Sequence, residues 1–358
     1  MKRGQPISRR TFIKLAATAA AGAALAGCSP KVSTIGSTET ATAGIKPTVP
    51  PSPTSGITAI ATSPAGTIPT QGGSIESPTS SPEPSPTTAP VYMAVIHGPD
   101  SATITRAAID TLGGMASFVH PGNDVIIKPN ICTDYLPPEY AATTNPTVVA
   151  TLVTMCLEAG AKRVRVMDYP FGGTPASAYE ISGIKEAVEI AGGEMGYMTY
   201  AKYVEVDIPQ GKSMTSTSIY RDILETDVLI NVPIAKTHSA AVLTLGEKNL
   251  MGIVMNRNVM HGDLHQRIAD LNSLVRPGLT VVDAVRILTA HGPTGGDLAD
   301  VKQTNTIIAS RDIVAADAYA ATLFGMIGSD VGYIQASADM GLGTMDLSSI
   351  NIQEINLG

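Results

Sequence analysis

The stretch Asp124–Asp168, DVIIKPNICTDYLPPEYAATTNPTVVATLVTMCLEAGAKRVRVMD, decides the fold class. It opens with the short β-branched run Asp124–Lys128 and closes with a second such run, Arg163–Asp168. Between them, Asn145-Pro146 supplies a capping side chain and a first-turn proline, and the apolar run Val148–Leu157 then stops before a glycine. A strand, a helix and a second strand in this order favour a mainly parallel sheet covered by helices.

The same alternation continues on both sides of this stretch. We therefore predict one α/β domain over residues 91–358, a length that suits a single sizeable core. Further strands are expected at Val91–His97, Asp227–Val232, Leu279–Asp283 and Thr304–Ala309, and further helices at Ser101–Ser117, Ile181–Ala191, Asp263–Val275 and Asp312–Phe324.

The N-terminus has the features of an export signal. Ser8-Arg9-Arg10-Thr11-Phe12-Ile13-Lys14 precedes an Ala-rich apolar run that is too short to span a bilayer core, which needs about 20 helical residues. Leu25-Ala26-Gly27-Cys28 matches a lipoprotein cleavage box. We predict a twin-arginine signal over residues 1–28 and lipidation of Cys28. The mature chain would then be membrane-anchored on the outer side of the cytoplasmic membrane or in the periplasm.

Residues 29–90 are predicted to be a disordered Pro/Ser/Thr-rich linker. They hold 12 of the chain's 25 prolines, no aromatic residue and only five charged ones. Such a composition cannot bury enough apolar surface to offset the entropy of ordering.

Composition excludes several classes of function. The net charge of −7 makes nucleic acid an improbable partner, and three cysteines without a C-x-x-C spacing exclude an iron–sulfur cluster. The glycine pairs do not have the spacing of a dinucleotide or phosphate fingerprint, so NAD and ATP are not supported.

Polar residues follow several of the predicted strands. In open parallel sheets ligands bind at the carboxyl ends of strands, where loops and helix N-termini converge. The residues placed there by this rule are Lys128, Asn130, Asn145, Asp168, Asn231, Lys236, His238 and Asp283.

These residues suggest an anion site with acid–base chemistry. Lys128, Lys236 and Lys248 would hold a carboxylate or phosphate, and His238 could transfer protons with Asp168 or Asp283 orienting it. The alternative is that these lysines pair with the aspartates and only rigidify the loops.

His261 and His265 lie four residues apart at the start of a predicted helix, so they could share a face and bind a divalent metal with Asp263 or Asp283. Solvent exposure or helix capping is the commoner explanation for such a pair. Cys132 follows Asn130 in a loop and could be reactive, although a single loop cysteine is more often incidental.

The ordered motifs resemble domain-of-unknown-function family 362 from about Val91 to Ile355. They are Ile127-Lys128-Pro129-Asn130, Thr144-Asn145-Pro146, Asp227–Pro233 running into Lys236-Thr237-His238, Lys248-Asn249-Leu250-Met251-Gly252, the following His261, Val281-Val282-Asp283-Ala284 and Ala315-Ala316-Asp317-Ala318. The resemblance implies that Lys128, Asn130, Asn145, Lys236, His238, Lys248, Asn249, His261, Asp283 and Asp317 occupy signature positions. It supplies no reaction. Some relatives carry ferredoxin-like cysteine clusters, which this chain lacks.

The sequence thus leads to a cell-envelope enzyme acting on a small anionic molecule, with a divalent metal as one option for its cofactor. We predict catalytic roles for Lys128, Lys236, His238 and Asp283, ligand binding by Asn130, Asn145, Asp168, Lys248, Asn249 and Asp317, and metal binding by His261 and His265. A non-catalytic ligand-binding or assembly lipoprotein, or a structural scaffold, would use the same residues for recognition or for ion pairing alone.

Overall fold

The structure is a computed structural model, and it describes residues 91–358. The predicted signal peptide, the predicted lipidation site Cys28 and the predicted linker lie outside the described residues.

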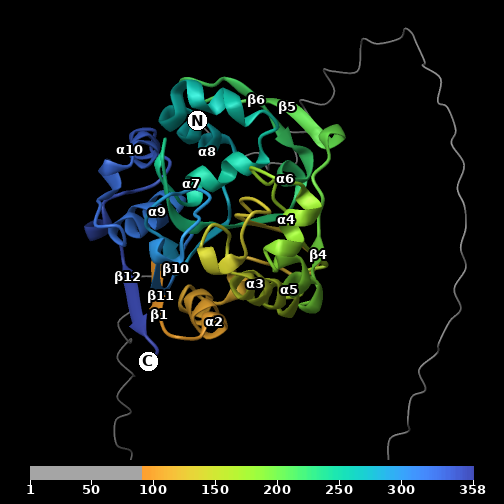
Figure 1. The fold of residues 1–358 in the computed structure, drawn as a ribbon, viewed down its shortest axis with the longest axis vertical. Helices are drawn as coiled ribbons and strands as arrows, with labels where there is room; N and C mark the ends of the chain where they lie inside the picture. Colours follow the sequence, from red (N-terminus) through yellow and green to blue (C-terminus); the bar gives the residue numbers. More distant parts are fainter. Residues whose placement is uncertain (1–90) are drawn as a thin grey trace, which may run out of the picture. The chain divides into compact units, whose positions relative to one another are not determined.

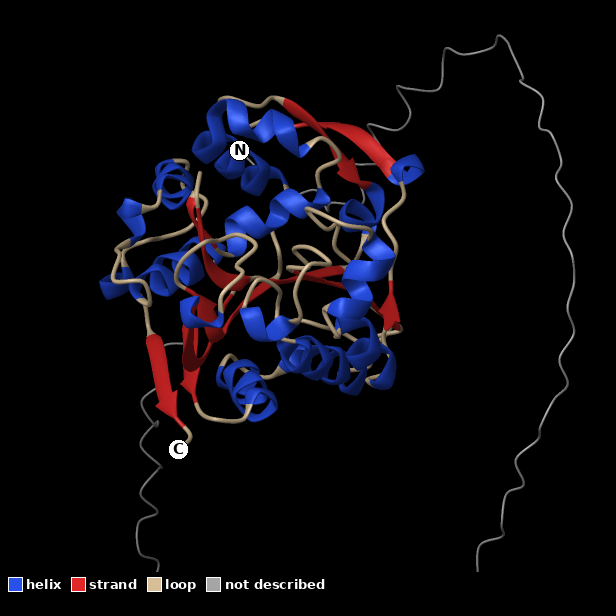
Figure 2. Ribbon diagram, in the orientation of Figure 1, coloured by secondary structure: helices blue, strands red, loops and turns tan. Residues whose placement is uncertain are grey.

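The described chain forms a ten-stranded sheet with helices on both faces, which confirms the α/β prediction (Figure 2). The strand order is β12-β1-β11-β10-β7-β2-β3-β4, with β8 paired to β10 and β9 paired to β8. A separate hairpin is formed by β5 and β6. The strands are β1 (Met93–His97), β2 (Asp124–Pro129), β3 (Arg163–Val166), β4 (Glu194–Met195), β5 (Tyr203–Asp207), β6 (Ser216–Tyr220), β7 (Val228–Val232), β8 (Ile234–His238), β9 (Val242–Thr244), β10 (Leu279–Leu288), β11 (Val301–Ser310) and β12 (Ile352–Asn356).

Parallel pairing dominates the part of the sheet that carries the predicted site. β10, β7, β2, β3 and β4 pair parallel in succession, whereas β11 is antiparallel to both of its neighbours. In the β2–β7 ladder Ile127 lies beside Ile230 and Lys128 beside Asn231. The polar residues at these two strand ends therefore lie side by side, as the strand-exit rule requires.

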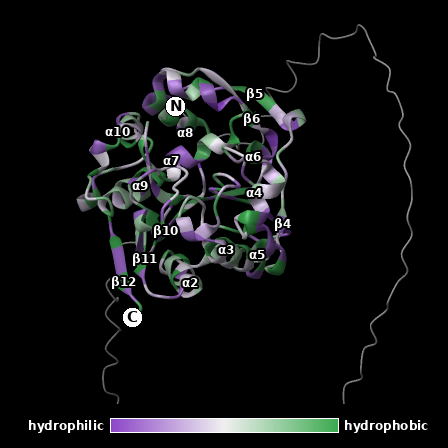
Figure 3. Ribbon diagram, viewed as in Figure 1, coloured by the Kyte–Doolittle hydropathy of each residue, from purple (hydrophilic) through white to green (hydrophobic). Residues whose placement is uncertain are grey.

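Helices bury both faces of the sheet in two hydrophobic clusters (Figure 1). On one face lie α2, α3, α4 and α5, and on the other α6, α7, α8, α9 and α10. Their bounds are α2 (Ser101–Thr111), α3 (Pro146–Glu158), α4 (Pro175–Ile181), α5 (Ile184–Ile190), α6 (Arg221–Glu225), α7 (Gly246–Asn249), α8 (Leu264–Leu274), α9 (Ile313–Thr322) and α10 (Gly332–Asp339). The edge strand β12 is largely hydrophilic (Figure 3), as suits a strand with one open side.

Local sequence explains where several helices begin and end. The Asn145 side chain accepts a hydrogen bond from Thr147 N at 3.0 Å and caps α3, as the Asn-Pro pair predicts. The predicted helix Ile181–Ala191 is wrong as one element, because Gly183 has a φ of +68° and separates α4 from α5.

The predicted end of a strand at Asp283 is also wrong. β10 continues to Leu288, because it passes from β7 to β8 at this point and keeps β11 as its other neighbour throughout. Asp283 therefore lies in mid-strand and is 1% exposed. Strands β4, β5, β6, β8, β9 and β12 were not expected from the sequence.

No helix in the described part of the chain combines the length and the apolar character needed to cross a bilayer.

Candidate functional site

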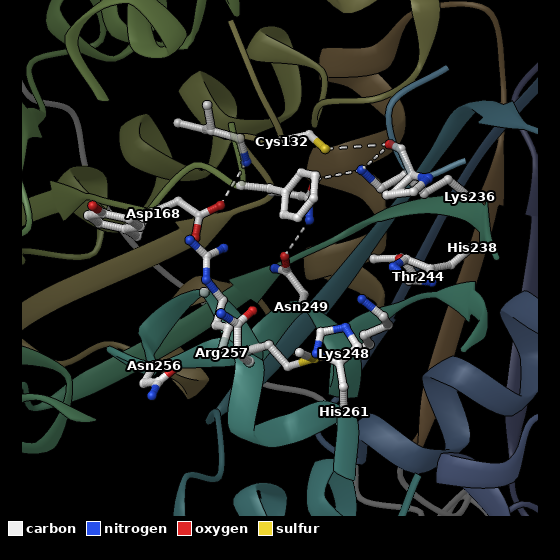
Figure 4. Close-up of a pocket in the computed structure, with 18 of the residues that line it drawn as sticks. Cys132, Asp168, Lys236, His238, Thr244, Lys248, Asn249, Asn256, Arg257 and His261 are labelled. Atoms are coloured by element: carbon white, nitrogen blue, oxygen red, sulfur yellow. Dashed lines mark hydrogen bonds between the residues drawn. The ribbon is translucent and has the colours of Figure 1, made fainter. Parts of the chain in front are cut away.

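A cavity of about 290 Å³ opens at the carboxyl ends of β2 and β3, beside β8 and α7. Its walls come from the loops that follow β2 and β3, from β8, and from the segment 244–261 (Figure 4). The predicted site residues that line it are Asn130, Asp168, Lys236, His238, Lys248, Asn249 and His261. Strand exits separated by more than a hundred residues therefore do meet in one hollow.

Lys128 lies just behind the cavity wall and forms an ion pair with Asp168, which lines the cavity. Lys128 Nζ is 2.8 Å from Asp168 Oδ1, and both side chains are almost fully buried. Asp168 Oδ2 accepts a hydrogen bond from Ile131 N at 2.8 Å. Burial lowers the pKa of Lys128, and the neighbouring carboxylate opposes that shift. The pair is the one that the ion-pairing alternative describes, and Asp168 balances the charge of this lysine within the protein.

Gly252 lets α7 and the following 3-10 turn lie against this pair. A Cβ atom at this position would stand 2.2 Å from Asp168 Oδ1 and 2.8 Å from Lys128 Nζ. Only a hydrogen fits there, which explains the glycine in the motif Lys248–Gly252.

Asn249 joins α7 to the ends of β2 and β7. Its Nδ2 donates to Asn231 Oδ1 at 2.9 Å, and its Oδ1 accepts from Asn130 Nδ2 at 2.9 Å and from Lys128 Nζ at 3.3 Å. The amide is 3% exposed, so these bonds satisfy a polar group that would be costly to bury alone. Asn249 thereby fixes the helix turn that carries Lys248.

Lys236 is a buried cation held by neutral oxygens. Its Nζ donates to Ala142 O at 2.6 Å, Pro293 O at 2.9 Å and Asn130 Oδ1 at 3.0 Å. The residue is 1% exposed, and none of the ion pairs in the described residues involves it. Its positive charge is therefore not compensated by a carboxylate.

Lys248 and Arg257 add two further cations without a carboxylate partner in the described chain. Lys248 lines the cavity, and burial lowers its pKa to about 7, with the nearby charges of Lys236 and Arg257 acting in the same direction. The Arg257 guanidinium lies 5.2 Å from the centre of the Tyr169 ring and donates to Pro170 O at 2.8 Å.

His238 is held as a neutral imidazole. Its Nδ1 accepts hydrogen bonds from Ala240 N at 3.0 Å and Ala241 N at 3.2 Å. Burial lowers its pKa to about 3, and Lys248 and Lys236 add to the shift. Because Nδ1 acts as an acceptor, the ring proton resides on Nε2. His238 thus lines the cavity with an N–H donor at Nε2, while the proton transfer suggested by the sequence stays a prediction.

Asp283 and Asn145 lie away from the cavity wall and serve the start of α3. Asp283 Oδ2 accepts from Asn145 N at 2.7 Å, and Oδ1 accepts from Val285 N at 3.1 Å. Burial raises the pKa of Asp283 to about 6. The helix start therefore attracts an anion as expected, but that anion is a side chain of the protein.

Asp317 likewise accepts hydrogen bonds from the backbone N–H groups at the start of α7. Its two carboxylate oxygens accept from Gly246 N at 2.7 Å and Glu247 N at 2.8 Å, and burial raises its pKa to about 8. It holds the helix that presents Lys248 without lining the cavity itself.

The two histidines of the predicted metal pair belong to different elements. His261 lies in the 3-10 turn Arg257–Asp263 and lines the cavity, whereas His265 lies in α8 with its ring stacked on Tyr333 at 6.3 Å between centroids. Within residues 91–358 no group of three or more His, Cys, Asp or Glu side chains is arranged to hold a metal ion. The metal remains a prediction that the geometry does not support.

Some lining residues were missed by the strand-exit rule. Arg257 and Asn258 come from the 3-10 turn Arg257–Asp263 and Asn256 precedes it, in a part of the chain where no strand ends. The signal available was the polar run before His261. Cys132 lines the cavity as well, and its Sγ lies 3.5 Å from Pro293 O, the carbonyl that Lys236 also contacts (Figure 4).

The sequence that forms this fold and this cavity is similar to that of known proteins. Residues 125–322 match the family described as Domain of unknown function (DUF362), and the chain belongs to that family. Over 230 residues the chain is 27% identical to the thylakoid-associated protein sll1697 of Synechocystis sp. (strain ATCC 27184 / PCC 6803 / Kazusa). That alignment covers 59% of this chain and 66% of the relative, a little under two thirds of its length.

Among solved structures, the chain is similar to the lactate racemase apoprotein from Thermoanaerobacterium thermosaccharolyticum. The superposition has a TM-score of 0.40 and 12% sequence identity, and it covers 63% of this chain and 55% of that one. A likeness of this degree carries no information about activity.

Proposed function

We propose that this protein is an enzyme acting on a small anionic molecule, a carboxylate or a phosphate, that binds in the cavity between β8, α7 and the loop holding Arg257. One observation carries the proposal: three cations border the cavity, and none has a carboxylate partner in the described chain. They are Lys236, Lys248 and Arg257.

The charge balance of the cavity wall leads to this proposal. Asp168 is the one carboxylate among the described residues that line the cavity, and Lys128 already neutralises it. Burying cations costs free energy unless an opposite charge is near. At an effective dielectric constant of about 20, an anion ~4 Å away interacts with a single cation by ~4 kcal/mol. A bound anion would supply the missing charge, although the net charge of the chain is −7.

The size and the donors of the cavity indicate a small ligand. A volume of about 290 Å³ is at the lower end of the ~300–1,000 Å³ range for small-molecule pockets. Arg257 and the nearby side-chain amides offer N–H donors, which suit carboxylate or phosphate oxygens, and Lys236 contributes its positive charge.

His238 favours an enzyme over a simple binder. A neutral imidazole with its proton on Nε2 can hydrogen-bond to an oxygen where negative charge develops, without carrying a charge of its own. A non-catalytic ligand-binding protein is the second candidate, because the same cations would serve recognition alone.

Ligand-dependent stabilisation tests the proposal. Thermal unfolding of residues 91–358 is followed with a panel of small carboxylates, phosphate esters and uncharged analogues. At a ligand concentration of about 100 times Kd the fold gains ~2.7 kcal/mol, which raises Tm by several degrees.

The variants R257Q and K185Q give the matched comparison. Lys185 is a surface lysine paired with Glu180, so K185Q removes a positive charge far from the cavity. The stabilisation should be lost in R257Q and kept in K185Q. If no anion in the panel stabilises the wild type, or if R257Q responds like K185Q, the proposal is wrong.

We further propose that the mature chain is exported and anchored to the membrane through a lipid on Cys28. The motif Leu25–Cys28 supports this, as does a relative whose name describes it as thylakoid-associated. Incorporation of labelled palmitate into the wild type and into C28A, together with membrane fractionation, tests it. Equal labelling of the two proteins would contradict the anchor.

A further inference from the structure

Lys248 is a primary amine with a free face inside the cavity. It lines the cavity on the turn α7, and its side-chain amine takes part in none of the hydrogen bonds or ion pairs found within residues 91–358. In this respect it differs from Lys236, whose three protons are all donated to protein oxygens. Figure 4 shows Lys248 between Asn249 and His261, across the cavity from Cys132. Its nitrogen is therefore available to a molecule that enters.

The surroundings of Lys248 make a larger fraction of this amine neutral and nucleophilic at pH 7 than in an ordinary lysine. The charged and titratable groups that affect it are Lys236 on β8, Arg257 after α7 and Cys132 after β2, and His238 on β8 feels its charge in turn. The two cations and burial together lower the pKa of Lys248 to about 7. A lysine desolvated beside another cation is the arrangement that activates amines for imine chemistry.

Groups that complement a 2-oxo acid surround this amine. Arg257 can hold a carboxylate, the charge of Lys236 attracts it, and the Nε2–H of His238 is a neutral donor suited to an adjacent carbonyl oxygen. The cavity has room for a molecule of this size.

We infer that Lys248 condenses with the carbonyl carbon of a small 2-oxo acid or aldehyde acid to form an imine. The inference rests on the proposed anion site and adds to it the class of substrate and the residue that bonds to it.

The step balances without any further reactant. The Nζ lone pair forms a bond to the carbonyl carbon and gives a carbinolamine, whose hydroxyl then leaves. The two amine protons and the carbonyl oxygen depart as one water molecule, and a carbon–nitrogen double bond remains. A hydrogen bond from His238 to the carbonyl oxygen would draw electrons toward that oxygen during the addition.

Reductive trapping tests the inference. The protein is treated with glyoxylate or pyruvate and cyanoborohydride at pH 7, and modified lysines are mapped by peptide mass spectrometry. An amine with a pKa near 7 is about half unprotonated at this pH, on the order of a thousandfold more than an ordinary lysine. Lys248 should therefore be modified first, and by a wide margin over other lysines.

K248R is the decisive variant, because arginine keeps the positive charge and cannot form the imine. Binding of propionate, which has no carbonyl group, is measured on the same proteins by thermal shift. We expect the wild type to bind propionate and to be trapped at Lys248, and K248R to show no trapping at residue 248. Trapping at Lys185, a paired surface lysine, serves as the background level.

The outcomes separate the two proposals. If propionate binds but Lys248 is trapped no faster than Lys185, the imine is refuted and the anion site stands. If neither binding nor selective trapping occurs, both are refuted. A thiol adduct at Cys132 in place of the lysine adduct would also refute the imine, because it would identify a different nucleophile.

Discussion

Lys128 near the end of β2 and Lys236 in the middle of β8 belong to the same sheet, yet their electrostatic surroundings are opposite. Lys128 has the Asp168 carboxylate at 2.8 Å and lies behind the cavity wall, whereas Lys236 contacts only neutral oxygens and lines the cavity. The first lysine is part of the framework. The second leaves a positive charge for something outside the protein to balance. The difference teaches that a buried lysine of the sheet is left for ligand binding where no carboxylate within residues 91–358 pairs with it.

The largest expected effect comes from breaking the buried pair. D168N leaves the Lys128 ammonium without its counter-charge in a site where both side chains are almost fully buried. Removing one partner of such a pair costs about 3–5 kcal/mol, which chemical denaturation would measure. The double variant K128M/D168N should recover much of that loss. A single variant as stable as the wild type would show that the pair does not support the fold.

A smaller loss is expected from crowding the same pair. In G252A the new methyl group would stand 2.2 Å from Asp168 Oδ1, so the pair or the turn must shift. Overpacking of this kind costs about 1–3 kcal/mol. G278A is the control, because the nearest atom to its added methyl group is Leu229 O at 3.9 Å. Equal stability of the two variants would contradict the close approach of α7 to the pair.

The smallest expected effect is a pH dependence of the affinity of the cavity for propionate. The pKa of Lys248 is about 7, so its amine is cationic below that pH and neutral above it. The affinity for propionate should therefore fall as pH rises from 6 to 8, by up to about tenfold, or ~1.4 kcal/mol. Calorimetric titration at several pH values would measure this. In K248M the fall should be absent, and an unchanged fall would assign it to another group.

The sequence predicts which residues gather at this site better than it predicts which of their charges are paired. Parallel strands bring their carboxyl ends together, so Lys128, Asn130, Asp168, Lys236 and His238 could be gathered without coordinates. Whether a given lysine is paired depends on contacts between distant segments, such as the forty residues between Lys128 and Asp168. No periodicity or motif in the sequence shows that these two side chains lie 2.8 Å apart.

Two errors in the site have physical causes. Asp283 was expected at a strand end, but β10 changes partner from β7 to β8 there and continues for five more residues. Arg257 was missed because its loop follows no strand, and its position depends on stacking against Tyr169.

The most direct test of the central claim is calorimetric titration of residues 91–358 with inorganic phosphate and with propionate, at low salt and pH 6.5. The account predicts that at least one of these anions binds once per chain. It also predicts that R257Q weakens that binding at least about tenfold while K185Q leaves it unchanged. If neither anion binds, or if R257Q and K185Q bind with equal affinity, the claim that the cavity cations bind an external anion is contradicted.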